Sequence, residues 1–587
     1  MLAVRDPTTN ATRVADPSAP TGAGASAGGA NPTGKQLLGA QSSTSTAGTA
    51  GWFGPVSGIH APIWLEGVPT VFLDSLHIEA LPSTTASVAP PSGTLAFTAT
   101  LRDSYATARG ATHSAHTTGN DPYGDYILVA RVFEARLHHN TTELDFLDPR
   151  AENATVVATL STRFESGGSF GNASLGIASA ALSLEIPPAS LKLWSPDAAW
   201  LHGVEVDLID NRTGGMVLRE TVTSYAGVRS LAVINSTATS SGARIALNGE
   251  PLAIIGVRDQ GYWPDGLTTA PSDSAIAADV LSARALGFNA VRKEEHVAER
   301  RYYFHADAAG MMVLQDIPAL SMRAAAAARP PAEGRGRRDE GRRAVASVQP
   351  TPAMEAQFIA EARAIVAARR MHPSIVAWSV FNEGWGEADG DGGAFATAAV
   401  AAVAAADVSR PTAAAAAAAG HAPSRLVIGA VGWDGFGLGQ LRALAPEADG
   451  PLLPRDRRAD SATPDGAKPL LLDNVGGWSW STAVDNAACV AYDELGAPRV
   501  TLANASAFAT AYDALVNVLI LQALQNTNNK LSLTPLSGFV FDQLFDVETQ
   551  CSGVMSAARS IKGGDATLAA VRDANALLAK AVRTYSR

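Results

Sequence analysis

One glutamate of this sequence is placed to transfer a proton. Glu383 follows the apolar run 375–381, comes directly after Asn382, and precedes a Gly-Trp-Gly turn that contains Trp385. A carboxyl group beside an indole ring is partly desolvated, and desolvation raises its pKa, which suits a general acid near neutral pH. A carboxylate that only caps the next helix is the alternative interpretation.

Polar residues end several other short apolar runs in the second half of the chain. They are Arg258 and Asp259, Arg292 and Lys293, Gln315 and Asp316, Trp433 and Asp434, Asp473 and Asn474, and Asp542 and Gln543. Each of these residues, taken singly, could be an ordinary solvated strand end. Strands with a purely structural role, however, do not require polar residues at the same end of one strand after another. Aromatic residues near the same runs offer flat apolar faces to a ligand, or else pack in the core. They are Tyr262, Trp263, Trp378, Trp385, Trp433, Trp478 and Trp480.

The elements that position these residues alternate between strand and helix from about residue 240 onward. Apolar runs predict strands at 252–258, 288–293, 311–316, 375–382, 425–431, 469–474 and 537–543. Helical spacing predicts helices at 272–287, 299–310, 353–370, 504–526 and 565–584. This order predicts parallel βαβ units closed into a (β/α)₈ TIM barrel, in which polar strand ends meet at one mouth. The sixth of the eight strands is expected near 440–446.

Other segments are expected to lie outside this pattern. Residues 1–50 are rich in small and polar residues and are interpreted as disordered. From Trp52 to about residue 238, short alternating segments separated by turn residues predict an antiparallel β-sandwich. Residues 323–350 and 387–423 are interpreted as insertions in the barrel. The first is basic, and we interpret it as a solvated loop rather than a site for an acidic partner.

Long motifs in the chain resemble glycoside hydrolase family 2, the family of β-galactosidases, β-glucuronidases and β-mannosidases. Residues 372–386, HPSIVAWSVFNEGWG, resemble the segment of that family that ends in Asn-Glu. Residues 51–66 resemble the end of its sugar-binding jelly roll, residues 193–208 its immunoglobulin-like domain, and residues 247–266 and 285–318 the first three barrel strands. The resemblance therefore implies a disordered segment and jelly-roll remnant at 1–66, an immunoglobulin-like β-sandwich at 67–238, and a TIM-barrel domain at 239–587. Because only the last jelly-roll strands fit before residue 66, it implies an N-terminally truncated member.

The resemblance also implies roles for individual residues. In the family, the glutamate of Asn-Glu is the acid/base and the asparagine contacts the sugar's 2-hydroxyl, so these roles fall on Glu383 and Asn382. The remaining substrate-binding residues that we expect are Arg292, Trp385, Trp433, Trp478, Asp259 and Asp542. No metal and no cofactor is expected.

The nucleophile position departs from the family's pattern. Residues 468–480, KPLLLDNVGGWSW, resemble the segment in which a glutamate before an aromatic-Gly-Gly attacks the sugar, but alignment on the two glycines puts Asn474 there. Retaining glycosidases need two carboxyl groups about 5–5.5 Å apart, and an amide is a poor nucleophile. Asp473 is adjacent, but neighbours on a strand point to opposite faces. We therefore expect Asp473 to point into the barrel wall unless a bulge turns it.

Composition limits the partners of the chain. A net charge of −11 argues against nucleic acid or an anionic membrane surface. No run of about 18 apolar residues occurs outside alanine-rich tracts, so no membrane span is expected. Cys489 and Cys551 fit no zinc or redox spacing and are interpreted as small core residues. The partner that we expect is a carbohydrate, and the oligomeric state stays open.

The compartment also stays open. Seven glycosylation sequons suit a secreted or endomembrane protein, but sequence rich in serine and threonine produces them by chance as well. The N-terminus lacks the apolar region of a signal peptide. The sequons are at Asn10, Asn140, Asn153, Asn172, Asn211, Asn235 and Asn504.

Three functional hypotheses follow. The first is a retaining hydrolase of β-linked glycosides, β-galactosidase-like, in which Glu383 is the acid/base and Asn474 impairs turnover. The second is a non-catalytic carbohydrate-binding pseudoenzyme on the same scaffold. The third is a structural relic with an unstable fold, because a missing jelly roll would leave apolar sandwich surface exposed.

Overall fold

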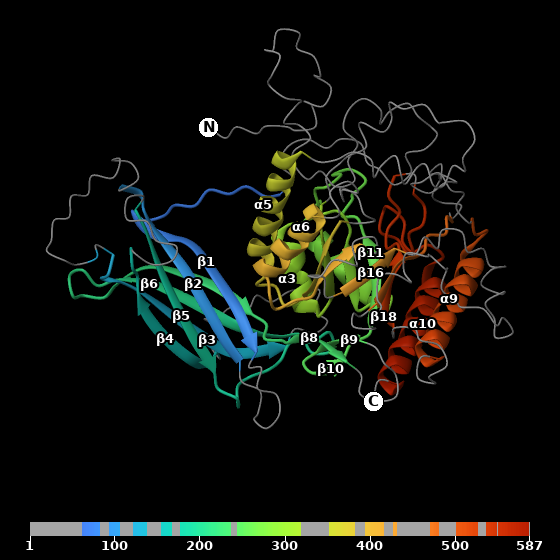
Figure 1. The fold of residues 1–587 in the computed structure, drawn as a ribbon, viewed down its shortest axis with the longest axis horizontal. Coiled ribbons are helices and arrows are strands. Elements are labelled where there is room, and N and C mark those ends of the chain that lie inside the picture. The colour runs from blue at the N-terminus through green and yellow to red at the C-terminus, as the bar shows by residue number, and fades with distance from the viewer. Residues whose placement is uncertain are drawn as a thin grey trace, which may run out of the picture.

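The structure is a computed structural model of the 587-residue chain. It describes residues 61–82, 93–105, 121, 123–137, 154–166, 176–235, 243–318, 351–381, 394–415, 426–430, 470–480, 501–525, 536–548 and 550–585. Within these residues, two facing β-sheets lie beside a closed β-barrel that is flanked by helices (Figure 1). The expected jelly-roll remnant lies almost wholly outside the described residues, since only 61–66 are described, as an exposed segment without strands.

The two N-terminal sheets are antiparallel and share one core. One has the strand order β1-β2-β5 and the other β4-β3-β6-β7. Their bounds are β1 Val71–Pro82, β2 Gly93–Asp103, β3 Tyr126–Leu137, β4 Val156–Arg163, β5 Ile177–Ile186, β6 Trp200–Asp210 and β7 Val217–Ala226. Every second residue of β2 is buried over most of its length, as pleating requires of a strand with one face in a core. Phe97 of one sheet and Leu128 and Val206 of the other belong to the same buried cluster.

The barrel consists of eight parallel strands that neighbour one another in chain order and close between the first and the last. They are β11 Ile254–Asp259, β12 Ala290–Lys293, β13 Met312–Ile317, β14 Ile375–Val380, β15 Thr412–Ala415, β16 Leu426–Ala430, β17 Leu470–Gly476 and β18 Leu536–Asp542. A closed parallel barrel with helices between its strands is a TIM barrel, as the alternation in the sequence predicts.

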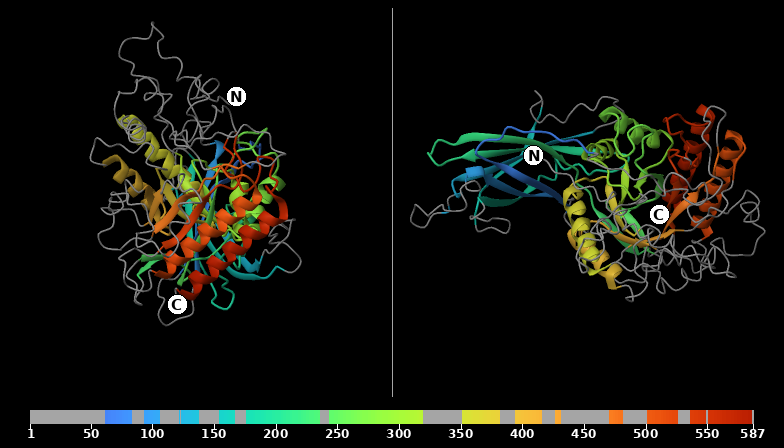
Figure 2. Two further views of the ribbon diagram at one scale, coloured as in Figure 1. Left: turned by 90° about the vertical axis from the view of Figure 1, so that its right-hand side faces the viewer. Right: turned by 90° about the horizontal axis from the view of Figure 1, so that it is seen from above.

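The described helices lie around the outside of this barrel (Figure 2). They are α2 Asp273–Ala285, α3 Arg300–Ala309, α5 Pro352–Arg369, α6 Ala394–Ala406, α9 Ala505–Gln525 and α10 Gly564–Tyr585. The helix ends follow the sequence closely. The Ser272 hydroxyl accepts a hydrogen bond from the Ala275 N–H at the start of α2, and Gly310 ends α3 at a φ of 69°, in the left-handed region that favours glycine.

The fifth barrel strand corrects the expected position of the strand that could not be identified in the sequence. We expected the unread strand to be the sixth, near 440–446, and interpreted 387–423 as an insertion. Instead the fifth strand is β15, inside that segment, and α6 also lies there. Alanine carries little signal for a strand because it is neither β-branched nor large. The sequence of β15, TAAA, therefore does not predict a strand. The segment is a strand because it pairs with β14 on one side and β16 on the other.

The N-terminal end of the barrel is covered by the sheets that precede it. Trp194 and Ile245 are buried in one cluster with Ile254 and Met312 of the barrel interior. Strands β8 Leu231–Asn235, β9 Ala243–Leu247 and β10 Glu250–Pro251 form a small sheet beneath the barrel (Figure 1). The expected boundary at residue 238 falls between β8 and β9, which pair with each other.

Hydrogen bonds to buried groups tie the sandwich to the barrel. The fully buried Arg229 guanidinium donates to the carbonyls of Pro373 and Ile375, at 2.7 and 2.6 Å, just where β14 begins. The indole N–H of Trp194 donates to the carbonyl of Asp307 of α3 at 2.8 Å, and the Tyr225 hydroxyl donates to its carboxylate at 2.7 Å. Because these buried groups satisfy one another across the junction, the sandwich and the barrel form one packed unit.

Two findings bear on the chain's environment. Cys551 is disulfide-bonded, and the sequence holds one other cysteine, Cys489. Cys551 is buried as expected, but because it is disulfide-bonded its interpretation as an ordinary small core residue is wrong, and Cys489 lies outside the described residues. Among the described helices, none is long and apolar enough to cross a membrane.

Candidate active site

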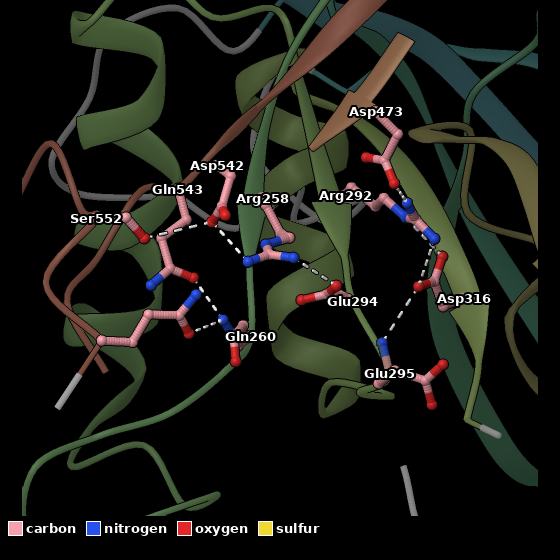
Figure 3. A network of polar contacts seen from close by, with 11 residues as sticks. Arg258, Gln260, Arg292, Glu294, Glu295, Asp316, Asp473, Asp542, Gln543 and Ser552 are labelled. Carbon is pink, nitrogen blue, oxygen red and sulfur yellow. Dashed lines mark hydrogen bonds and ion pairs between the residues drawn. The ribbon is translucent and has the colours of Figure 1, made fainter. Parts of the chain in front are cut away.

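The barrel interior has an apolar lower part and a charged upper part. Near the N-terminal ends of the strands, the side chains of Ile254, Ala290, Met312 and Val540 form a buried cluster. Near the C-terminal ends, arginines and carboxylates replace them (Figure 3). In TIM barrels the chemistry lies at the C-terminal ends of the strands, so this upper part is the candidate active site.

Arg292 links two strands across the barrel. Its guanidinium pairs with both carboxylate oxygens of Asp316, at 3.0 Å each, and also with the Asp473 carboxylate (Figure 3). Strand β12, which carries Arg292, is separated from the β17 strand of Asp473 by β11 and β18. The contact between them therefore crosses the barrel's interior. All three side chains are buried.

Arg258 forms a second ion-paired group at the same level. Its guanidinium donates to Glu294 at 2.8 Å and to Asp542 at 2.6 Å, and these side chains are also buried (Figure 3). Arg258 and Arg292 are direct partners in the parallel register of β11 and β12, so both side chains leave the sheet on the same face. Substrate-binding roles were expected for Arg292 and Asp542, and the structure brings both into this interior.

The orientation of Asp473 corrects an expectation. We expected pleating to turn this side chain into the barrel wall, but its contact with Arg292 places it inside the barrel. Ordinary alternation explains it, because Leu471, two residues earlier on the same strand, belongs to the buried cluster of the barrel interior. The register of β17 against β18 shifts only between Leu472 and Val475. Residues Leu472 and Val475 are three apart while their β18 partners are two apart, which is the extra residue of a β-bulge.

Asp259, expected to bind substrate, lies on the outer face of the barrel. Its carboxylate accepts a hydrogen bond from the Lys293 ammonium at 2.8 Å, and that ammonium lies 4.4 Å from the ring centroid of Tyr302 on α3. Burial opposes ionisation of Asp259, but Lys293 outweighs it and lowers the pKa of the carboxyl group. Strand neighbours alternate and Arg258 already points inward, so Asp259 does not enter the interior beside it.

Trp478 also lies elsewhere than expected. It is only 3% exposed and packs edge-on against Phe508 of α9 and Phe541 of β18. Trp480 stacks on the same Phe508 ring at 4.4 Å. These rings fill the layer between barrel and helix, so in this structure Trp478 is a packing residue and not an exposed ring. Trp378 is likewise buried and donates to Asp407 at 2.9 Å.

The remaining candidate residues cannot be placed. Asn382, Glu383, Trp385 and Trp433 lie outside the described residues. For Asn474, the structure describes only a backbone position within β17. What the structure does describe is the strand that leads to Glu383: β14 ends at Val380, at the same end of the barrel as the charged interior.

Some residues of the charged interior were not in the expected set. Asp316 was recognised as a strand end but given no role, and Glu294 follows β12 directly. Burial raises the pKa of Asp316 to about 6, against the opposing effect of Arg292. The Asp316 and Asp473 carboxylates in turn outweigh burial and hold the pKa of Arg292 well above its usual value. Side chains alternate between the two faces of a strand. The rule that places Arg292 of β12 inside the barrel could therefore also have placed Asp316 of β13 there.

A further polar group adjoins Asp542. The Gln260 amide donates to the side-chain oxygen of Gln550 at 3.0 Å and also to that of Gln543, while the Ser552 hydroxyl lies 3.5 Å from Asp542 (Figure 3). Buried amides can both donate and accept, so they can bind hydroxyl-rich ligands as well as one another. No group of metal-binding side chains occurs among the described residues.

Arg292 should be essential for stability as well as for the site. We expect Arg292→Met to lower the free energy of unfolding by about 3–5 kcal/mol at pH 8, because it leaves Asp316 and Asp473 buried without their cation. Urea unfolding followed by circular dichroism measures this. The loss should shrink at pH 5, where protonation of the orphaned carboxyl groups relieves the penalty.

A matched control separates this effect from the loss of any arginine. Arg572 and Asp573 on α10 form an exposed pair, with side chains 54% and 70% exposed. Arg572→Met should change stability by less than about 1 kcal/mol. Equal effects of the two substitutions would contradict a structural role for the Arg292 ion pairs.

Comparison with known proteins agrees with this architecture. Residues 241–425 match the family described as "Glycosyl hydrolases family 2, TIM barrel domain". A β-galactosidase of Lactococcus lactis is 27% identical over 133 residues, which are 22% of this chain and 12% of the length of that relative.

Solved structures share the fold over most of the chain. A β-glucuronidase from Ruminococcus gnavus in complex with C6-substituted uronic isofagomine superposes with a TM-score of 0.54 at 13% identity, covering 86% of this chain and 68% of that one. The β-glucuronidase of Parabacteroides merdae gives 0.54 at 13% identity over 86% of this chain and 52% of that chain. Bacteroides uniformis β-glucuronidase 2 gives 0.52 at 16% identity over 84% and 50%.

Fold and site together define a TIM-barrel protein with charged residues at the C-terminal ends of its strands. The barrel-domain match, the β-galactosidase match and the shared fold support its assignment to glycoside hydrolase family 2.

Proposed function

We propose that this protein is a retaining β-glycosidase, β-galactosidase-like, whose turnover is limited by Asn474. The observation that carries the proposal is the position of β14. This strand ends at the charged mouth of a closed barrel, and the residues that follow it in the sequence are Asn382 and Glu383. In this proposal Glu383 protonates the leaving oxygen, and Asn382 binds the 2-hydroxyl of the sugar.

The other parts of the chain have supporting roles in the same proposal. The two facing sheets within 67–238 are the family's immunoglobulin-like domain, and the barrel at 239–587 is the catalytic domain. Arg292 and Asp542 contribute to the floor of the sugar site. Arg229, which binds the start of β14, connects the sandwich to the strand that leads to Glu383.

A second candidate is a carbohydrate-binding protein without catalytic activity. It is favoured by the state of Asp473, whose carboxylate is already ion-paired with Arg292 and is only 1% exposed. A carboxylate whose oxygen is held by a guanidinium in this way is a weaker nucleophile toward an anomeric carbon. With asparagine at position 474, neither residue supplies a ready attacking group.

Hydrolysis of aryl β-glycosides tests the proposal. We expect at most slow release of the aryl group from a β-galactoside by the unmodified protein. In the Asn474→Glu variant, which supplies an attacking carboxylate, the sugar should first appear as the β-anomer in proton NMR spectra, because two displacements retain configuration. Binding of galactose-type ligands without any turnover at high enzyme concentration would favour the second candidate. A first-formed α-anomer would contradict the retaining mechanism.

A further inference from the structure

The turn between β6 and β7 carries a sequence that cells can modify. Residues 211–213, Asn-Arg-Thr, form a glycosylation sequon, whose middle residue is not proline. The sequon follows directly on the last residue of β6, and Asp210 pairs in the register with Val217, the first residue of β7. Asn211 therefore lies at the tip of a β-hairpin of the sandwich.

This hairpin tip is open to solvent. Asn211 is partly exposed, and residues 212–219 that follow it are all exposed. The Asn211 carbonyl accepts a hydrogen bond from the Gly214 N–H at 2.9 Å, which closes a β-turn. Gly214 has a φ of 73°, and a Cβ atom built there would meet no heavy atom of a residue beyond its chain neighbours within 4 Å. A bulky group attached to Asn211 therefore has free space beside the turn.

Three apolar side chains lie exposed directly after this turn. Met216 is 61% exposed, Val217 43% and Leu218 55%. They stand at the start of β7, which is the last strand in the order β4-β3-β6-β7. Exposed apolar residues on an edge strand favour association with other chains, and natural proteins cover or charge such edges. A hydrophilic group attached beside Met216–Leu218 would cover this edge.

The disulfide of Cys551 indicates the kind of compartment in which the chain folds. Disulfides form and persist in oxidising compartments, whereas the cytosol keeps thiols reduced. In eukaryotic cells the compartment that forms disulfides is also the one in which asparagine side chains are glycosylated. This observation lies in the barrel, far along the chain from Asn211, and is independent of the sequon.

We propose that Asn211 is an N-glycosylation site and that its glycan covers the apolar edge at Met216–Leu218. The donor is an oligosaccharide joined to a polyprenyl pyrophosphate. The amide nitrogen Nδ2 of Asn211 forms a bond to the anomeric carbon of the oligosaccharide and loses one proton to solvent. The bond from that carbon to the pyrophosphate oxygen breaks, and the lipid pyrophosphate leaves with the electron pair. The inference goes beyond the proposed function and does not depend on it.

Mass spectrometry of the protein purified from the cells that naturally make it tests the site. Peptide N-glycosidase should release an oligosaccharide and convert the modified asparagine to aspartate in the tryptic peptide that ends at Arg212. Variants expressed in the same cells assign the modification. Asn211→Gln and Thr213→Ala should both lose the glycan, while Thr213→Ser, which keeps the hydroxyl, should keep it. Asn517→Gln, at an exposed asparagine of α9 outside any sequon, should leave the glycan unchanged.

Sedimentation velocity tests the covering role of the glycan. Without it, the Asn211→Gln and Thr213→Ala proteins should self-associate about 10-fold more strongly, the scale of burying one aliphatic side chain. Adding Leu218→Lys to Asn211→Gln should reverse this gain, because a charge on an edge strand opposes pairing. An unmodified Asn211 in the natural protein would overturn the proposal, even if other sequons carry glycans. A glycan on Asn211 whose loss leaves self-association unchanged would overturn its covering role.

Discussion

Glu383→Gln is expected to lower kcat on aryl β-glycosides by about 10²–10⁴-fold without unfolding the protein, the range that a positioned general acid contributes. The glutamine side chain has the same length but has no proton to give to the leaving oxygen. The loss should therefore be largest for poor leaving groups, which need protonation, and smallest for nitrophenolates, which leave without it. A series of aryl glycosides with leaving groups of rising pKa measures this directly.

The same series provides its own control. Glu250→Gln makes the identical change at an exposed position on β10 and should leave every rate unchanged. The variants are compared in both the unmodified chain and the Asn474→Glu chain, so that slow turnover of the former does not hide the effect. Full turnover of the Glu383→Gln protein on a poor leaving group would place the acid/base on another residue.

Much of the barrel could be predicted from the sequence because its signals are local. An apolar run gives a buried strand, and the polar residue that follows it marks the strand's C-terminal end. Caps such as Ser272 and Gly310 are set by the residue's own chemistry, so the ends of α2 and α3 agree with the sequence to within a residue or two. The fifth strand, β15, could not be found in this way because its alanines are placed by β14 and β16.

Side-chain direction at the strand ends was predicted less well. Arg258 and Asp259 are neighbours, so at most one of them can enter the barrel, and alternation applied to this pair would have removed Asp259 from the expected site. The same rule misled at Asp473 because it was counted from Asn474 as the inward residue, whereas counting from Leu471 of the interior cluster places Asp473 inside. The register of β17 against β18 also shifts between Leu472 and Val475, so alternation does not run evenly through this stretch. A bulge depends on the pairing between two strands, and one strand's sequence does not reveal it.

The tryptophans show a different limit. A sugar-binding platform and a core residue both call for a large apolar ring near a strand end, so the sequence alone cannot separate them. Trp478 and Trp480 are core residues because both pack on Phe508 of α9, which Tyr512 of the same helix supports from behind by stacking on it. Whether these rings are buried depends on the packing of a helix about 30 residues further along the chain, and residues 468–480 alone do not predict that packing.

Asn474→Glu is expected to raise kcat/KM on aryl β-glycosides by at least about 100-fold. A glutamate there would supply the attacking carboxylate of a retaining mechanism, and loss of a nucleophile can cost a hydrolase as much as about 10⁶-fold. Asn474→Gln has the same added length but no charge, so it should give no gain. Azide should rescue the unmodified chain instead, because a small anion can attack in place of the missing carboxylate and release a glycosyl azide of inverted configuration.

The competing possibility for the nucleophile is Asp473, which points inward to Arg292. If Asp473 attacks the sugar, the unmodified chain should already reach about 10 s⁻¹ or more, the usual median for enzymes, and Asp473→Asn should abolish this. We expect the opposite, slow turnover that Asp473→Asn changes little relative to the gain from Asn474→Glu. The reason is electrostatic: Arg292 neutralises the Asp473 carboxylate and holds it at the floor of the barrel, whereas an attacking group must keep its charge free for the anomeric carbon. A glutamate at position 474 would have no such partner among the described ion pairs.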